Sequence, residues 1–339
     1  MNDSLRNGQS GTADRISQVR GIIAAAEAGG HWPPLFVTPV SVEDMAAGDG
    51  LEVCDLIEAL CTVSKDGFAG AAGENLELRV WQWALMLHLF ARHAAGALVG
   101  RRLHRLGLIG MPRKNGKSGI ASGVALDGLL TEGRGAEIYS AAAEKEQAKI
   151  VFGEVKRTVE ASPELLELCR PMRDVIEVPS TNSVYRALSA EAYSKEGLNP
   201  NRSIVDELHA HPTRELFDVL NLAMGARRDP MLIAITTAGV KTDTTGGNSV
   251  CFELYLYGVQ CAAGDIVDPS FFFAVIGTFG RESRLRRPDR PARLRLVRAA
   301  DTGERVPHEA SQSVGFERAS VVRGRRLGRP RGAARSATG

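Results

Sequence analysis

The chain has 339 residues, 44% of them hydrophobic and 24% charged, which is typical of a soluble globular protein with one large domain or two smaller ones. No apolar run reaches the roughly 20 residues needed to span a bilayer, and the polar N-terminus lacks the apolar segment of a secretory signal. The sequence thereby excludes a membrane-spanning or secreted protein. The five cysteines form no CxxC pair, which argues against a zinc or disulfide framework.

The net charge of +2 hides an uneven distribution of basic residues. Residues 281–339 contain 16 arginines, no lysine and six acidic residues, a net charge of +10, which leaves −8 for residues 1–280. The last lysine of the whole chain is Lys241. Two segments with such different usage are predicted to differ in origin or in role.

The N-terminal part of the chain predicts a polar leader followed by helices. Residues 1–20 are polar and contain Gly and Ser, which indicates a loose leader. A glycine-rich loop is expected over residues 67–73. Helix-like apolar spacing predicts helices in chain order over 16–28, 42–61 and 77–93, the last of them well buried.

The middle of the chain alternates short apolar strands with helices, which argues for a parallel sheet covered on both faces. Strands are predicted over residues 103–110, 136–141, 184–188, 203–205 and 231–236. Helices are predicted over residues 116–130, 144–161 and 215–224. After Ile276 this alternation stops, and the remaining residues show no periodicity.

The strongest local motif is Gly110-Met-Pro-Arg-Lys-Asn-Gly-Lys-Ser118, which lies between a predicted strand and a predicted helix. The phosphate-binding P-loop has the pattern GxxxxGK[ST] in that context. Gly116, Lys117 and Ser118 fit the end of the pattern, but Met111 stands where the first glycine belongs. The alternative is a basic turn before an amphipathic helix.

The chemistry of the motif favours nucleotide binding. Backbone amides near Gly116 face phosphate oxygens at a helix N-terminus. Lys117 is expected to reach the β- and γ-phosphates, and the Ser118 hydroxyl to ligate magnesium. Arg113 and Lys114 add positive charge to the loop.

A second motif is an apolar strand that ends in two carboxylates, Asp206 and Glu207. In P-loop ATPases such an aspartate holds magnesium, and the following glutamate polarises the attacking water. Since adjacent strand residues point to opposite faces, both can serve only where the chain turns; a surface strand end is the alternative. A metal site at His209 and His211 is disfavoured, and sensing of the γ-phosphate or local capping is preferred.

Two further polar groups are candidates for contacts with nucleotide. The strand over residues 231–236 ends in Thr236 and Thr237, whose hydroxyls can respond to a γ-phosphate at the carboxyl edge of the sheet; an ordinary strand end is the alternative. Gln82 places one amide in an apolar helix and can both donate to and accept from an adenine edge. Spacing alone favours a solvent-facing position for Gln82.

Together these pieces resemble the large terminase subunit of tailed bacteriophages, which packages double-stranded DNA into proheads. The likeness covers roughly residues 40–276, and the order and spacing of its motifs also match. The matching segments are Trp81-Gln82, Pro112–Ser118, Tyr139–Gln147, Gly197–Pro200, Val205–His211 and Ile235–Gly239.

The resemblance implies a magnesium-dependent ATPase with a P-loop NTPase fold of the ASCE type, an α/β fold with a mostly parallel sheet flanked by helices. It implies nucleotide-binding roles for Gln82 (on adenine), Arg113, Lys114, Asn115, Gly116, Lys117 and Ser118. It implies Arg113 near the γ-phosphate, Glu207 as the catalytic base, and Ser118 and Asp206 as Mg²⁺ ligands. Thr236 and Thr237 become the coupling motif, and residues 144–147 a segment tied to DNA translocation.

The resemblance also implies partners and a place of action. Double-stranded DNA, a portal protein, a small terminase subunit and a homo-oligomeric ring are expected, in the cytoplasm of a bacterial host and with no membrane. The expected domains are an N-terminal leader over 1–40, an ATPase domain over 41–276 and an arginine-rich, low-complexity, disordered tail over 277–339.

The nuclease domain that the resemblance implies is not recognisable here. The abrupt change of composition suggests translation in a shifted reading frame, and a genuine DNA-binding extension is the competing hypothesis. The expected function is therefore an ATP-hydrolysing packaging motor in a truncated form without nuclease activity. Another P-loop DNA-dependent ATPase, such as a helicase or repair enzyme, and a non-functional prophage remnant remain as alternatives.

Overall fold

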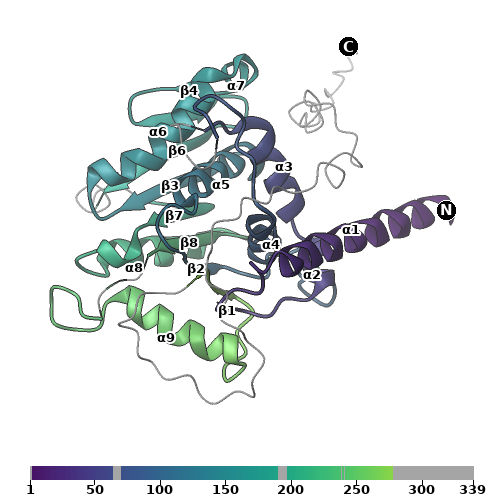
Figure 1. The fold of residues 1–339 in the computed structure, drawn as a ribbon. Coiled ribbons are helices and arrows are strands. Elements are labelled where there is room, and N and C mark those ends of the chain that lie inside the picture. Colours follow the sequence, from purple (N-terminus) through teal and green to yellow (C-terminus); the bar gives the residue numbers. More distant parts are fainter. Residues whose placement is uncertain (1, 64–69, 190–196, 238, 240, 278–339) are drawn as a thin grey trace, which may run out of the picture. The chain divides into compact units, whose positions relative to one another are not determined.

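The computed structural model describes residues 2–63, 70–189, 197–237, 239 and 241–277 (Figure 1). The chain divides into two compact units, Met1–Arg305 and Val306–Gly339, and every described residue lies in the first. Within the described part, no helix is both long and apolar enough to cross a membrane. The tail that was expected to be disordered, from residue 278 onward, and residues 67–69 of the predicted glycine-rich loop lie outside the described residues.

The N-terminal segment is helical. α1 (Asn2–Ala28) buries Val19 and Ala26 and packs against α2 (Val42–Ala47) and α4 (Val80–Leu89). Arg15 fastens it by donating to the carbonyls of Ala46 and Gly48, both at 2.8 Å, and by pairing with Glu52. The expectation of a loose leader over 1–20 is therefore wrong, because tertiary contacts stabilise a helix that polar composition disfavours.

The helix predicted over 42–61 is two helices, α2 and α3 (Gly50–Leu60), separated by Gly48 and Asp49. A Cβ atom at Gly48 would lie 2.4 Å from the carbonyl oxygen of Phe90, so the chain passes too close to the end of α4 for any side chain. Ser41 caps α2 by accepting from the Asp44 amide at 3.0 Å. The break follows from a close backbone approach that periodicity cannot reveal.

The strands of the described residues form one nine-stranded sheet with the order β1-β9-β2-β8-β7-β3-β6-β5-β4. The six central strands from β9 to β6 pair in parallel, and β1 at one edge and β5 and β4 at the other pair antiparallel. The strands are β1 (Phe36–Val37), β2 (Leu106–Gly110), β3 (Glu137–Ala142), β4 (Arg170–Pro171), β5 (Val175–Val178), β6 (Ser183–Ser189), β7 (Arg202–Asp206), β8 (Met231–Thr236) and β9 (Phe271–Val275).

Helices cover both faces of the sheet, as the fold class requires (Figure 1). α8 (Glu215–Ala223) and α9 (Val250–Ala263) share one core with β2, β7, β8 and β9. α5 (Lys117–Thr131) and α6 (Lys145–Ala161) pack together on the other face. There α3 packs against α5, α4 packs against α3, and α7 (Pro163–Leu168) packs against α6. The predicted α/β fold with a mostly parallel sheet flanked by helices is confirmed.

Most elements of the middle segment lie where periodicity predicted them, with ends shifted by a few residues. β1, β4, β5 and β9 and helices α7 and α9 were not predicted. β9 is a run of Phe-Phe-Phe-Ala-Val buried on both faces between β1 and β2. Gln82 is buried rather than solvent-facing, so the expectation from spacing is wrong there.

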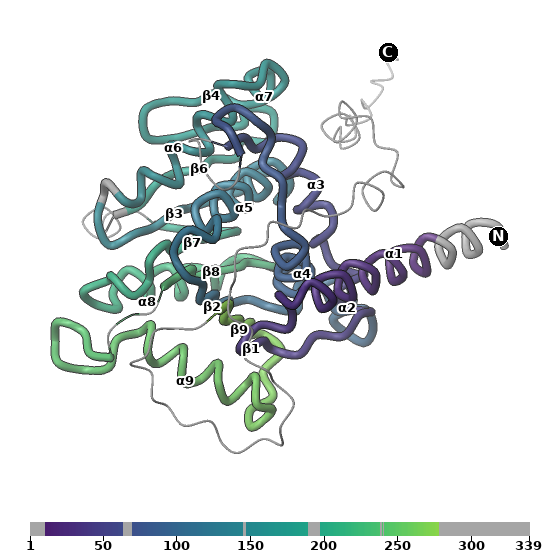
Figure 2. The backbone as a smooth tube through the Cα atoms, in the orientation of Figure 1, coloured from purple at the N-terminus to yellow at the C-terminus, as the bar shows by residue number. Residues whose placement is uncertain are grey.

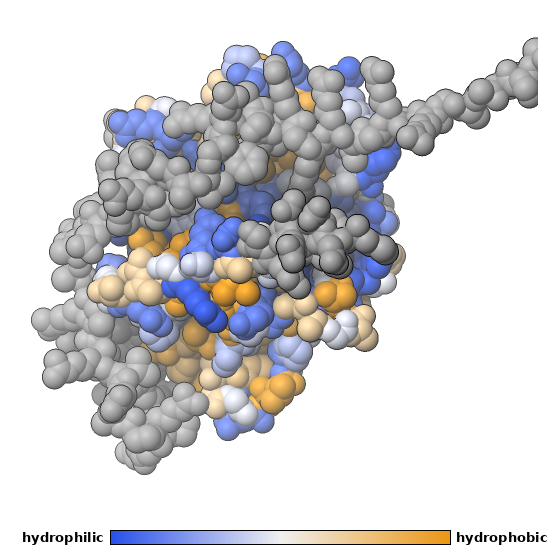
Figure 3. Space-filling view, turned by 90° about the vertical axis from the view of Figure 1, so that its right-hand side faces the viewer, coloured by the Kyte–Doolittle hydropathy of each residue, from blue (hydrophilic) through white to orange (hydrophobic). Residues whose placement is uncertain are grey.

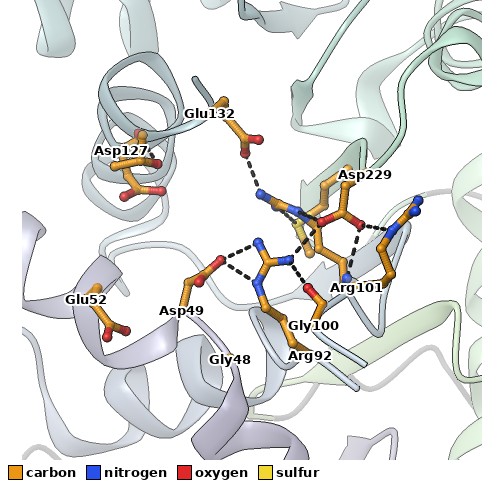
Figure 4. A network of polar contacts seen from close by, with 12 residues as sticks. Gly48, Asp49, Glu52, Arg92, Gly100, Arg101, Asp127, Glu132 and Asp229 are labelled. Atoms are coloured by element: carbon orange, nitrogen blue, oxygen red, sulfur yellow. Dashed lines mark hydrogen bonds and ion pairs between the residues drawn. The ribbon is translucent and has the colours of Figure 1, made fainter. Parts of the chain in front are cut away.

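A network of charged side chains lies at the amino ends of the parallel strands. Arg202, the fully buried first residue of β7, pairs with Asp127 at 2.7 Å and with Glu132 at 2.6 Å on and after α5. Arg92 joins Asp49 at 2.6 Å to Asp229 at 2.8 Å (Figure 4). The network ties α3, α5 and the starts of β7 and β8 together at the edge opposite the strands' carboxyl ends.

Large apolar side chains that remain exposed are scattered over several elements. They are Leu98, Val99, Ile150, Leu166, Met172, Leu222, Leu256 and Val267. On the face shown in Figure 3, the coloured atoms mix orange and blue residues in small areas. Single exposed apolar side chains of this kind are ordinary for a folded chain.

Candidate functional site

Three neighbouring strands end side by side at the carboxyl edge of the sheet (Figure 2). β2 ends at Gly110 and β7 at Asp206, while β8, which lies between them, ends at Thr236. Ligands of open α/β sheets bind outside the carboxyl ends of their strands. The phosphate-loop motif, the acidic pair and the threonine pair of the sequence therefore meet at one place.

The loop over residues 111–116 links β2 to α5. The Met111 amide donates to the Thr236 carbonyl at 3.0 Å, which fastens the start of the loop to β8. Lys114 and Gly116 both have left-handed backbone, with φ of 68° and 78°. Gly116 directly precedes α5, so the unpaired amides of the first helical turn open toward the loop. Such a helix start attracts anions.

A pocket of about 540 Å³ lies against this loop, a size within the usual range for small-molecule sites. Its wall is formed by the loop before α5, the first turn of α5, helix α6 and the turn after β7. It is lined by Arg113, Lys114, Gly116, Lys117, Ser118, Gly119, Gln147, Glu154, Glu207, His209 and Ala210. Three cationic side chains therefore face a cavity with no permanent anion other than Glu207 and Glu154.

Lys117 is the central cation of the pocket. Its ammonium is buried and makes no hydrogen bond of acceptable geometry to any described residue. Its nitrogen nevertheless lies 3.0 Å from Glu207 Oε1, which is close enough for an ion pair. The angles of this contact do not meet those of a hydrogen bond. A buried ammonium is costly unless it is hydrogen-bonded, and an anion that accepts its protons in this pocket would satisfy it.

The two carboxylates at the end of β7 are separated by the backbone. Asp206 is the last residue of the strand, and Glu207 has left-handed φ and ψ of 48° and 50° before the short turn at Leu208–Ala210. This conformation costs a non-glycine residue roughly 1–3 kcal/mol and clusters at functional sites. It breaks the alternation of the strand and brings Glu207 into the pocket, as a turn at this place was expected to do.

Asp206 is suited to a cation. Burial, and next the neighbouring charge of Glu207, raise the pKa of its carboxyl to about 6, while Lys117 opposes the shift. Its Oδ1 accepts only the Glu207 amide, at 3.0 Å, among the hydrogen bonds of the described residues. A buried carboxylate and the Ser118 hydroxyl at the pocket wall are hard oxygen donors, the type that Mg²⁺ prefers. The residues present therefore fit the ion.

His209 connects Glu207 to the end of β8. Its Nδ1 lies 3.1 Å from Glu207 Oε2 and 3.1 Å from the Thr236 hydroxyl. The Thr237 hydroxyl donates to Glu207 Oε2 at 3.4 Å and lies 3.3 Å from the same Nδ1. Burial lowers the pKa of His209, against the opposite effect of Glu207, and thereby favours the neutral ring. The threonine pair thus contacts the acidic motif directly through the Thr237 hydroxyl and also through the His209 imidazole.

Gln82 and Asn115 support the loop from outside the pocket. Gln82 Nε2 donates to the Asn115 carbonyl at 3.2 Å, and Gln82 Oε1 accepts from the Arg79 amide at 2.8 Å. Asn115 Nδ2 donates to the Pro112 carbonyl at 3.2 Å. Both amides therefore hold the loop in shape, and neither lines the pocket as described.

The structure brings the other sequence-based candidates together. Arg113, Lys114, Gly116, Lys117, Ser118 and Glu207 line the pocket, and Asp206, Thr236 and Thr237 lie directly behind it. Sequence reasoning missed Glu154, which accepts from the Ser122 hydroxyl at 3.4 Å. It is seven residues after Gln147, which is two helical turns, and that spacing could have placed both on one face of α6.

Comparisons with known proteins agree with this geometry. The family model described as "Terminase large subunit, ATPase domain" matches residues 81–257, more than half of the chain. The large terminase subunit of Enterobacteria phage HK97 is 34% identical over 195 residues, which cover 56% of this chain and 36% of that protein. Protein YmfN of Escherichia coli (strain K12) is 48% identical over 77 residues, covering 23% of this chain and 16% of that protein.

One solved structure matches both in sequence and in fold. The crystal structure of the HK97 bacteriophage large terminase aligns with a TM-score of 0.56 and 25% identity, covering 70% of this chain and 45% of that one. This chain thus spans less than half of the length of the relatives it matches.

Proposed function

The chain belongs to the family of terminase large subunit ATPase domains, and from this premise we propose that its pocket hydrolyses ATP to drive double-stranded DNA into a phage prohead. The observation that carries the proposal is the buried Lys117 ammonium, which faces the pocket beside Glu207 without a hydrogen bond to any described residue. A γ-phosphate supplies oxygens that can accept hydrogen bonds from this ammonium.

The proposed roles follow from position. Lys117 binds the β- and γ-phosphates, and the backbone amides from Gly116 into the first turn of α5 bind their oxygens. Arg113 and Lys114, both exposed on the loop, add positive charge near the γ-phosphate. Glu207 acts as the general base on the attacking water. The adenine contact proposed for Gln82 uses the donor and acceptor capacity that its two protein hydrogen bonds leave.

Ser118 and Asp206 are the residues that would hold Mg²⁺. The ion, when bound, neutralises charge on the phosphate oxygens. Asp206 orients the Glu207 amide through its Oδ1 at 3.0 Å and keeps a second oxygen for the ion's shell. Thr236 and Thr237, which lie behind Glu207, form the proposed coupling motif.

The proposed setting is that of the packaging motor. Residues 41–276 form the ATPase domain, residues 1–40 pack α1 and β1 against it, and residues 277–339 form the arginine-rich tail. We place the protein in a homo-oligomeric ring with a portal protein and a small terminase subunit, in the cytoplasm of a bacterial host. The HK97 relative is named as the large terminase subunit, and this chain matches 36% of its length.

The test is magnesium-dependent ATP hydrolysis by the purified chain beside Lys117→Ala and Glu207→Gln. Wild type is expected to hydrolyse ATP. Glu207→Gln is expected to lose at least about 10²-fold in kcat while it still binds nucleotide, because it removes general-base catalysis. Lys117→Ala is expected to lose both binding and turnover, because it removes the cation on the phosphates.

Arg173→Ala is the matched control, since Arg173 is highly exposed and pairs only with its neighbour Asp174. It is expected to keep wild-type activity. Equal hydrolysis by all four proteins would mean that the activity arises elsewhere and would overturn the site. A folded wild type that neither binds nor hydrolyses ATP would overturn the ATPase proposal for this chain.

A further inference from the structure

Glu207 has contacts at both carboxylate oxygens. Lys117 lies on Oε1 at 3.0 Å, and His209 and Thr237 lie on Oε2 at 3.1 and 3.4 Å. If Lys117 turns to a γ-phosphate, Oε1 loses its cation and is free to accept a proton from water. Oε2 then depends on His209 and on the longer contact from Thr237.

The hydrogen bonds around His209 determine which ring nitrogen carries the proton. Thr236 has one hydroxyl proton, and it is donated to the Thr237 carbonyl at 2.9 Å. The Thr236 oxygen therefore accepts from His209 Nδ1 at 3.1 Å. Glu207 Oε2 lies at the same distance from that nitrogen as an ion-pair contact whose geometry does not make a hydrogen bond. Because the Thr236 proton is already donated, its oxygen requires a proton on Nδ1, so the neutral ring is protonated at Nδ1.

The backbone of Gly239 lies close to His209. A Cβ atom at Gly239 would lie 2.4 Å from His209 Cβ, so no side chain fits at Gly239 without displacing the histidine. The backbone amide of His209 also donates to the Thr236 hydroxyl at 3.2 Å. His209 is thus fixed to β8 by its amide, by its ring and by contact with Gly239.

We propose that His209 is a positioning residue for the ATPase reaction: its Nδ1–H donates to the Thr236 hydroxyl, and its ring lies 3.1 Å from Glu207 Oε2, so that it positions the general base against the end of β8. The inference rests on the proposed function, because a positioned base needs a reaction to serve. His209 touches no reacting atom; it keeps the second carboxylate oxygen fixed while Lys117 leaves the first. Through His209, the end of β8 at Thr236 is also connected to the general base Glu207.

The experiment compares His209→Asn, His209→Gln and His209→Leu in the full chain. An Asn amide places its Nδ2 near the position of Nδ1, whereas Gln extends to the position of Nε2 and Leu offers no donor. We expect kcat to fall roughly 10- to 100-fold in the Gln and Leu variants with little change in KM for ATP. The Asn variant is expected to retain most of kcat.

Gly239→Ala tests the same point without removing a polar group. The new methyl group displaces His209, so a fall in kcat like that of His209→Gln is expected, again at constant KM. Gly225→Ala is the control, because a Cβ atom there meets nothing within 4 Å. Wild-type kcat in His209→Leu, an equal loss in the Asn and Leu variants, or a rise in KM in place of a fall in kcat would each overturn the proposal.

A measurement that needs no turnover separates this inference from the proposed function. The ¹⁵N shifts of the His209 ring in the nucleotide-free protein report which nitrogen is protonated, with His209→Asn used to assign the signal. We expect a neutral ring with the proton on Nδ1. A proton on Nε2 would overturn the positioning role even in an active enzyme. A proton on Nδ1 in a chain without ATPase activity would support the geometry of the link while the proposed function fails.

Discussion

At the scale of single residues, burial decides how the histidines titrate. His88 lies in the last turn of α4 beside Trp32, with ring centroids 4.8 Å apart, and its Nδ1 contacts the Ala84 carbonyl one turn earlier at 2.8 Å. Burial lowers its pKa from the ordinary value of 6.5 to about 4, with the Ala84 contact opposing the shift. The folded state therefore keeps this ring neutral where the unfolded chain would protonate it.

This shift predicts an acid-sensitive contribution to stability. Between pH 6.5 and pH 4 the unfolded state binds more protons at His88 than the folded state, so the contribution is complete above pH 6.5 and is lost as the pH falls. We expect His88→Leu to flatten the pH dependence of the melting temperature in this window. The measurement is a pair of melting curves at pH 7.5 and pH 5, and a parallel shift of the two proteins at both values would contradict the expectation.

At the scale of elements, buried ion pairs join helices to the sheet in addition to apolar packing. Arg202 at the start of β7 faces Asp127 within α5, and its guanidinium also lies 5.0 Å from the ring centroid of Phe90 after α4. Burial raises the pKa of the Asp127 carboxyl, and the Arg202 charge counteracts this. The pair sets the register between helix and sheet at the edge opposite the pocket.

Removing one partner of this buried pair is predicted to destabilise the fold strongly. Arg202→Met leaves Asp127 buried without its cation and is expected to cost roughly 3–5 kcal/mol of unfolding free energy. The double variant Arg202→Met with Asp127→Leu is expected to recover a large part of that loss. Urea denaturation of the wild type, the single variant and the double variant measures the three free energies of unfolding.

The matched control is Arg214→Met, since Arg214 pairs with Asp218 and Glu253 at the surface. An exposed pair of this kind is worth about 0–1 kcal/mol. A loss for Arg202→Met no larger than that of Arg214→Met would show that the buried network contributes little to stability.

At the scale of the whole molecule, the pocket couples the sheet edge to two helices. It takes residues from the loop before α5, from α6 and from the turn after β7, so a ligand that binds there links elements far apart in sequence. A ligand that binds only the folded state stabilises it by about 2.7 kcal/mol at 100 times its dissociation constant.

The expected result is a rise of the melting temperature of roughly 5–10 °C with magnesium and a non-hydrolysable ATP analogue at that concentration. Lys117→Ala is expected to show no such rise, because its pocket lacks the phosphate-binding cation. Glu207→Gln is expected to keep the full rise, since it loses the base and not the binding groups. An equal rise in Lys117→Ala would place the nucleotide elsewhere in the chain.

The middle of the chain could be predicted because local pattern and tertiary position agree there. The strands at β2, β3, β7 and β8 are apolar runs between helices, and the motifs at Lys117 and Asp206 stand at their ends. In the N-terminal part, apolar spacing predicted α1 from residue 16 onward, but not its earlier turns, which were expected to be loose. Arg15, at the end of those turns, contacts Ala46, Gly48 and Glu52, which are distant in sequence.

The sequence by itself determined the α/β class, the phosphate loop and the acidic pair, because these depend on residue type and on spacing along one segment. Only the tertiary structure decided that Gln82 is buried against the loop, that Glu154 faces the pocket and that His209 lies 3.1 Å from Glu207. Each of these contacts joins segments that the sheet order brings together, and that order arises from packing across the whole chain.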